Sequence, residues 1–174
     1  MTTTTLSRFT VALGAVVGLP AVAGGLNVNV EVPRLDVAEY HRPYVAMWLE
    51  KADGSVAATL SVWYDVKKRD AEGTKWLKDL RQWWRRTGRE LSLPIDGVTQ
   101  PTKPAGKHAL NFAEGTSPLP QLAPGQYKLQ VEAAREVGGR ELVSIPFEWP
   151  PKPGAALAAQ GKNELGAVTL ELKP

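Results

Sequence analysis

The sequence predicts an all-β protein, an antiparallel β-sandwich of about seven short strands with one inserted amphipathic α-helix. About seven stretches of the 174-residue chain alternate apolar and polar residues, as half-buried strands do, and Gly, Pro and Asp-Gly turn signals separate them. One stretch has helical periodicity instead. Short strands with frequent turns are typical of immunoglobulin-like sandwiches, and we expect residues 24–174 to form one such domain.

Each strand is predicted from its own pattern and from the turn beside it. Leu26–Val32 alternates almost without a break, whereas residues 45–50 are more continuously apolar and indicate a more deeply buried strand. Asp53-Gly54 predicts a hairpin turn that leads into a strand at 57–66. Further strands are predicted at 107–112, 126–135, 141–149 and 167–172, with long Pro-containing loops at 93–106 and 115–125 and an Ala-rich stretch before the last strand.

The predicted helix covers residues 75–86. On a helical wheel its large apolar residues fall within an arc of about 120°, the width of a stripe that packs against a core. Thr74 is the predicted N-cap, and Gly88 is the predicted C-terminal stop. We expect the stripe to anchor the helix through three tryptophans, Trp76, Trp83 and Trp84.

The opposite face of this helix is basic. Residues 67–90 contain nine basic and four acidic residues, whereas the whole chain has a net charge of only +3. One interpretation is a solvated polar face, as on any surface helix; the other is a patch that docks onto an anionic partner. We predict an exposed docking patch formed by Lys78, Arg81, Arg85 and Arg86.

Residues 1–23 have the layout of a secretory signal peptide. Arg8 precedes an uncharged stretch, 9–23, that ends in Ala21-Val22-Ala23, a pattern of small residues typical of a cleavage site. A membrane anchor or a buried helix is the alternative. The stretch is about 15 residues long and contains Gly and Pro, whereas a spanning helix needs roughly 20 apolar residues. We predict cleavage after Ala23, export to the periplasm and no membrane span afterwards.

The residue content excludes several classes of site. The chain has no cysteine, which excludes disulfides, thiolate metal sites and cysteine nucleophiles, and it has only two histidines, His41 and His108. The local motifs of hydrolases, metalloproteases and phosphate-binding loops are missing. The small net charge does not indicate nucleic acid. We predict a protein without catalytic residues, cofactor or metal.

Tyr40, His41 and Tyr44 raise the question of a haem or ferric-iron site, because Tyr and His both ligate iron. In an extended chain Tyr40 and Tyr44 would share one face and His41 would lie on the other. The alternation therefore argues against a joint site. It favours interfacial aromatic residues at the entry to a strand.

Several motifs resemble a bacterial family of predicted periplasmic proteins that is known only as a domain of unknown function. The resemblance implies export and an immunoglobulin-like sandwich. Residues 104–127 also resemble the hairpin of flagellar-hook-cap modules, although 111–115 here replaces the Trp-Asp-Gly turn usual in that hairpin. The matching segments lie within residues 40–172 and are 42–50, 53–54, 75–84, 97–99, 103–106, 124–127, 131–136 and 164–168.

The resemblance also implies a setting, because the family often accompanies membrane proteins of flavin-dependent redox and iron-uptake systems. Such an association fixes no chemistry. We expect an exported, non-catalytic accessory or binding module with a protein partner in the cell envelope, serving a system of that kind. The alternative is a structural or assembly protein that docks on an envelope complex through the basic Trp-rich helix.

Overall fold

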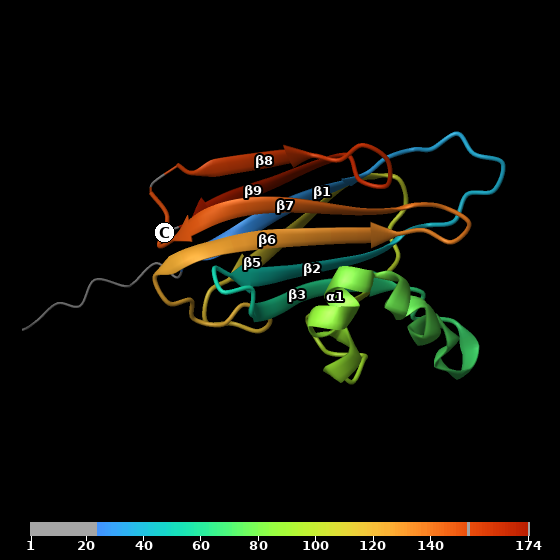
Figure 1. The fold of residues 1–174 in the computed structure, drawn as a ribbon, viewed down its shortest axis with the longest axis horizontal. Helices are drawn as coiled ribbons and strands as arrows, with labels where there is room; N and C mark the ends of the chain where they lie inside the picture. Colours follow the sequence, from blue (N-terminus) through green and yellow to red (C-terminus); the bar gives the residue numbers. More distant parts are fainter. Residues whose placement is uncertain (1–23, 153, 174) are drawn as a thin grey trace, which may run out of the picture.

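The computed structural model describes residues 24–152 and 154–173, so the predicted signal peptide lies outside the described residues. The described chain is mostly β, with two sheets and one short α-helix. Figure 1 shows the sheets as two layers, with the helical segment on the outer side of one of them. The β-rich prediction is confirmed, with nine strands in the described chain where about seven were predicted.

The first sheet has four strands, all paired antiparallel, in the order β5-β1-β9-β8. Strand β8 comes from the Ala-rich stretch, which the sequence did not indicate as a strand. Alanine has a low β-propensity, so pairing with β9 rather than side-chain pattern produces this strand. The bounds are β1 (Gly25–Val32), β5 (Gly106–Ala113), β8 (Ala156–Gln160) and β9 (Ala167–Lys173).

The second sheet has five strands in the order β4-β3-β2-β6-β7. Strand β4 pairs parallel to β3, which corrects the prediction of a purely antiparallel structure. It lies in the predicted loop 93–106, and three residues are too few to produce an alternation that can be read from sequence. The bounds are β2 (Tyr44–Lys51), β3 (Val56–Tyr64), β4 (Thr99–Pro101), β6 (Gly125–Ala134) and β7 (Arg140–Trp149).

A shared apolar core lies between the sheets. Alternate residues of facing strands enter it, such as Val28 of β1, Met47 of β2 and Val131 of β6, all fully buried. Part of the outer face of the second sheet is covered as well, because Trp48 of β2 belongs to a separate buried cluster on that side, the outer cluster. Strand β2 is therefore buried on both faces, as its continuous apolar sequence predicted.

The helical segment that covers the outer face is not the single α-helix predicted over 75–86. It consists of 3₁₀ turns at Arg69–Asp79 (η1), the α-helix α1 at Arg81–Arg86 and a short 3₁₀ turn at Gly88–Glu90 (η2). Leu80 separates η1 from α1, with a non-helical ψ of 69°. In a continuous α-helix the N–H groups of residues 82 and 83 would donate to carbonyls four residues earlier. Here they donate to the carboxylate of Glu132 on β6, so a new helix begins.

Both predicted caps have other roles. Thr74 lies inside η1, and its hydroxyl donates to the Ala71 carbonyl at 2.7 Å, so it caps no α-helix. Gly88 does not end the helical segment but begins η2. A Cβ atom at Gly88 would lie 2.6 Å from the Trp83 ring, so the absence of a side chain there permits the ring to pack.

Candidate functional site

An open groove of about 1290 Å³ lies on the described surface. Figure 1 shows the elements that form it at one end of the sandwich, where the β6–β7 turn, the β1–β2 connection and the helical segment meet. Its walls come from residues 40–44, 65–68 and 134–140, with Trp76 and Arg81 contributed by the helical segment. A second hollow, of about 320 Å³ beside η1, has no basic residue in its lining. The larger groove is therefore the candidate site.

Tyr40, His41 and Tyr44 all line this groove, contrary to the expectation from strand alternation. Strand β2 begins only at Tyr44, and the residues before it are not extended in a sheet, so their side chains do not alternate. The His41 Nε2 atom lies 2.8 Å from Glu39 Oε1, and its Nδ1 atom lies 3.7 Å from Glu136 Oε2. His41 therefore connects the first wall of the groove to the β6–β7 turn.

The Tyr44 phenol is a partly buried titratable group in this groove. Burial raises the pKa of Tyr44, and the negative charges of Asp65 and Glu136 raise it further, which together outweigh the hydrogen bond from the Asp65 backbone. The phenol therefore keeps its proton at neutral pH in the free protein. In residues 24–152 and 154–173 no group of three or more His, Cys, Asp or Glu is arranged to hold a metal ion.

The three predicted tryptophan anchors have different environments. Trp83 is fully buried, and Trp84 is partly buried against the outer cluster. The prediction is wrong for Trp76, which is 46% exposed and lines the groove, with the Lys78 Nζ atom 5.9 Å from the centre of its ring. Trp76 lies in 3₁₀ turns, where the 100° spacing of an α-helix does not apply, so it leaves the predicted stripe.

Of the four predicted docking residues, only Arg81 lines the groove. The Arg85 Nε atom donates to the carbonyl of Arg81 at 3.2 Å, and the Arg86 Nη1 atom donates to the carbonyl of Gly54 at 3.1 Å. These two guanidinium groups therefore stabilise their own helix and the β2–β3 turn. The docking role of the four residues stays a prediction.

The groove has further cations that the sequence did not assign to a site. Arg42, Lys67 and Lys68 line it together with Arg81, and none of these four forms an ion pair with a described residue. The sequence showed Lys67 and Lys68 only as part of a basic stretch. Their position directly after a strand was the available signal, because loops at strand ends commonly carry binding residues. The cations outnumber the groove's acidic residues, Asp65, Asp79 and Glu136.

The buried carboxylate of Glu132 positions Arg81 at the groove. Glu132 is fully buried on the outer face of β6 and accepts hydrogen bonds from the backbone N–H groups of Gln82 and Trp83, both at 2.9 Å. The first N–H groups of a helix have no partner within the helix, so this carboxylate fixes where α1 begins. It also accepts from Arg140 Nη1 at 3.0 Å. The sequence of β6 carried no signal for this role, because Glu132 occupies a polar position of the alternation, as Lys128 and Gln130 do.

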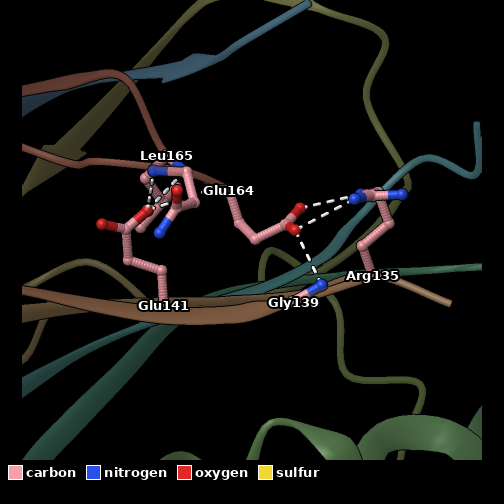
Figure 2. A network of polar contacts seen from close by, with 6 residues as sticks. Arg135, Gly139, Glu141, Glu164 and Leu165 are labelled. Carbon is pink, nitrogen blue, oxygen red and sulfur yellow. Dashed lines mark hydrogen bonds and ion pairs between the residues drawn. The ribbon is translucent and has the colours of Figure 1, made fainter. Parts of the chain in front are cut away.

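A second buried carboxylate holds the β6–β7 turn, which forms one wall of the groove. Glu164, in the loop between β8 and β9, accepts from Arg135 Nε at 2.9 Å, from Arg135 Nη2 at 3.1 Å and from the Gly139 N–H at 2.8 Å (Figure 2). The side chains of Arg135 and Glu164 are only 6% and 4% exposed. A bidentate, buried ion pair thus ties this wall to the other sheet.

Glu141, at the start of β7, fixes the loop that carries Glu164. Its carboxylate accepts hydrogen bonds from the N–H groups of four consecutive residues, 162–165, at 2.6 to 3.0 Å; Figure 2 draws Glu141 beside two of them, Glu164 and Leu165. Burial alone would raise the pKa of Glu141, but the four donors outweigh burial and hold the pKa below its ordinary value. The groove wall therefore rests on a network of charged hydrogen bonds that connects the two sheets.

A comparison with protein families agrees with the resemblance noted in the sequence analysis. No helix in the described part of the chain is long and apolar enough to cross a membrane. A family model described as "Predicted periplasmic protein (DUF2271)" matches residues 25–167, a range that includes every strand except β9, the helical segment and every wall of the groove. No significant match was found among curated proteins or among solved structures. The chain belongs to the DUF2271 family of predicted periplasmic proteins, a family of unknown function.

Proposed function

We propose that the mature protein is a non-catalytic binding module of the periplasm whose groove holds an anionic ligand or partner. One observation carries this proposal: exposed apolar side chains and cations without ion pairs meet in the same groove. The described chain has six large apolar residues that are exposed, and four of them line the groove: Tyr40, Val66, Trp76 and Val137. Clusters of exposed apolar surface are typical of binding sites.

The titratable groups of the groove support binding rather than catalysis. Catalytic acids and bases have pKa values tuned toward the working pH. Burial instead moves the pKa of Tyr44 upward, away from neutrality. Both ring nitrogens of His41 face carboxylates, those of Glu39 and Glu136, which leaves this imidazole engaged within the protein.

The proposed setting is an envelope flavin-redox or iron-uptake system. Its support is the association that the family resemblance implies, together with a periplasmic location. Visible and near-ultraviolet absorbance of the protein purified from periplasm would test it directly. We expect the groove to bind a partner protein from such a system, so the purified protein should show neither spectrum. A flavin or haem spectrum would instead indicate that the protein itself carries that cofactor.

We also propose that the two-sheet structure is an immunoglobulin-like sandwich. The antiparallel hairpins β2–β3 and β6–β7, and the core shared by two facing sheets, support this assignment. The parallel strand β4 at the edge departs from that pattern. A structural alignment of an experimental structure with immunoglobulin-like domains would test the assignment.

The second candidate function is an assembly protein that docks through the basic face of the helical segment. Its support is the exposure of Lys78 in η1 and of Arg85 in α1. Two of its four residues, Arg85 and Arg86, already donate hydrogen bonds within the protein, which gives this candidate less support than the groove.

Affinity capture from periplasm with the mature chain separates the two candidates. Three double variants each remove two positive charges: Lys67→Gln with Lys68→Gln in the groove, Arg85→Gln with Arg86→Gln on α1, and Lys107→Gln with Lys128→Gln as an exposed control. We expect the groove variant alone to lose the bound species while remaining folded. Loss in the α1 variant with retention in the groove variant would establish the assembly role instead.

A further inference from the structure

The occupant of the groove can be narrowed to one chemical class, an inference that rests on the proposed function. We infer that the groove binds an extended acidic segment of another periplasmic protein, in which large apolar side chains alternate with carboxylates. Three features of the described residues point to this class: the unpaired cations, the exposed apolar surface between them and the shape of the hollow.

The cations require an anionic occupant. Arg42, Lys67, Lys68 and Arg81 come from three separate segments and all line the groove without a carboxylate partner among the described residues. Positive charges that gather in one concave site raise the local potential and attract negative groups. Because they come from separate walls, they suit several carboxylates spread along a chain better than one compact anion.

The apolar surface requires large side chains in the same occupant. Trp76 is 46% exposed and Tyr40 is 38% exposed, so each offers an aromatic face within reach of the cations. Val137 in the β6–β7 turn is 74% exposed and has a φ of 52°, a conformation that a β-branched residue rarely adopts. In the free protein the Val137 side chain is not buried, so burial does not offset the strain of the turn. Contact with a partner would bury this side chain.

Arg135 offers one more donor to a carboxylate. Two of its guanidinium nitrogens bond Glu164, while Nη1 is directed away from that pair and has no hydrogen-bond partner in the described structure (Figure 2). An unpaired buried donor is uncommon and unfavourable. The Nη1 atom is covered by protein atoms in the free protein, so it would meet a carboxylate only if the β6–β7 turn moved.

The shape of the groove favours a polypeptide over other anions. Its volume of about 1290 Å³ exceeds the 300–1,000 Å³ of most small-molecule sites, and it is open rather than enclosed. A flat anionic membrane would meet the rim but would not reach residues in the walls, such as Tyr44. An extended chain can follow an open groove and place alternate side chains on opposite walls.

Titration calorimetry with matched synthetic peptides tests the inference. The probe is a short peptide of alternating Glu and Phe; one control replaces Glu with Gln, and the other replaces Phe with Ser. We expect the Glu/Phe peptide to bind at least about tenfold more tightly than either control and to weaken as salt is added. Vesicles of phosphatidylglycerol and inorganic phosphate serve as the alternative anion sources, and we expect neither to compete.

Protein variants locate the binding. We expect the Lys67→Gln/Lys68→Gln variant and the Trp76→Ser variant to weaken the Glu/Phe peptide by about tenfold each, and the Lys107→Gln/Lys128→Gln variant to leave it unchanged. All replaced side chains are exposed or partly exposed, so the variants should remain folded, which circular dichroism checks.

Three results would overturn the inference: no binding of the Glu/Phe peptide, equal binding of the Gln/Phe peptide, or tighter binding of vesicles or phosphate. The proposed function fails separately. If the groove variant loses capture from periplasm while acidic peptides do not bind, the binding module stands and only the acidic-segment inference falls.

Discussion

The middle of the five-stranded sheet, around β2, is buried on both faces, but by different means. The inner face is almost entirely apolar and packs against the other sheet through alternating residues such as Val45 and Leu129. The outer face combines apolar residues with the fully buried carboxylate of Glu132, and a segment of short helices covers it. The comparison shows that an apolar alternation needs only a second sheet, whereas a mixed face needs a cover that satisfies its polar groups.

Two tryptophans of the helical segment differ in whether the sheet holds their backbone. The backbone N–H group of Trp83 itself donates to Glu132, and the side chain of Trp83 is fully buried. Trp76 lies seven residues earlier, in 3₁₀ turns without such an anchor, and nearly half of it is exposed in the groove. Where the sheet holds the backbone, the aromatic side chain is structural; where it does not, the side chain is available for binding.

The largest expected effect comes from removing a buried side chain of the outer cluster. Trp83→Ala removes a fully buried ring and the hydrogen bond from its Nε1 to Thr59 Oγ1, so it should lower the free energy of unfolding by about 3–5 kcal/mol. Trp76→Ala is the matched control and should cost less than about 1 kcal/mol. Urea denaturation measures both, and equal costs would contradict the distinction between the two residues.

Glu132→Gln tests the anchoring carboxylate. The amide presents its NH₂ group to N–H donors and leaves Arg140 without its counter-ion, so we expect a loss of about 3 kcal/mol, the low end for breaking a buried pair because the Arg140 side chain is 38% exposed. Glu148→Gln, at an exposed position on β7, is the control and should be nearly neutral. A neutral Glu132→Gln in chemical denaturation would show that α1 does not depend on the carboxylate.

Gly88→Ala tests how closely Trp83 packs in the outer cluster. A Cβ atom 2.6 Å from the ring forces the ring or the backbone to move, and overpacking of this kind costs about 1–3 kcal/mol. Combining it with Trp83→Phe, which shortens the side chain, should cost less than the sum of the single changes. Strict additivity in thermal or urea unfolding would show that the two residues do not interact.

The smallest expected effect concerns the hydrogen bonds between Glu141 and residues 162–165, and it depends on pH. The donors of residues 162–165 lower the pKa of Glu141 in the folded state, so its carboxylate stabilises the fold above its unfolded pKa, and this stabilisation disappears as the pH falls through the lowered folded value. The stability difference between the natural protein and Glu141→Gln should therefore be largest at neutral pH and shrink in acid. Unfolding curves at several pH values measure it, and a pH-independent difference would contradict it.

Much of the β framework could be predicted from sequence. Strands such as β1 and β6 were predicted within a few residues, because one face of each meets the core and enforces alternation. Two strands were not predicted: β4 is too short for a pattern, and β8 is held by pairing with β9. Burial of Trp83 was also predicted, since any arrangement that covers a sheet buries the largest apolar side chain available.

The candidate site was decided by tertiary structure. Sequence alone determined the basic stretch and the aromatic segment around His41, both of them local patterns. It did not bring the two together, because their contact depends on where β6 ends and how its turn is held by Glu164 from the other sheet. It also placed Trp76 in the core, because helical periodicity assumes a continuous helix. The backbone N–H groups of Gln82 and Trp83 bind Glu132, fifty residues later, and a contact across that distance leaves no periodic trace in the sequence.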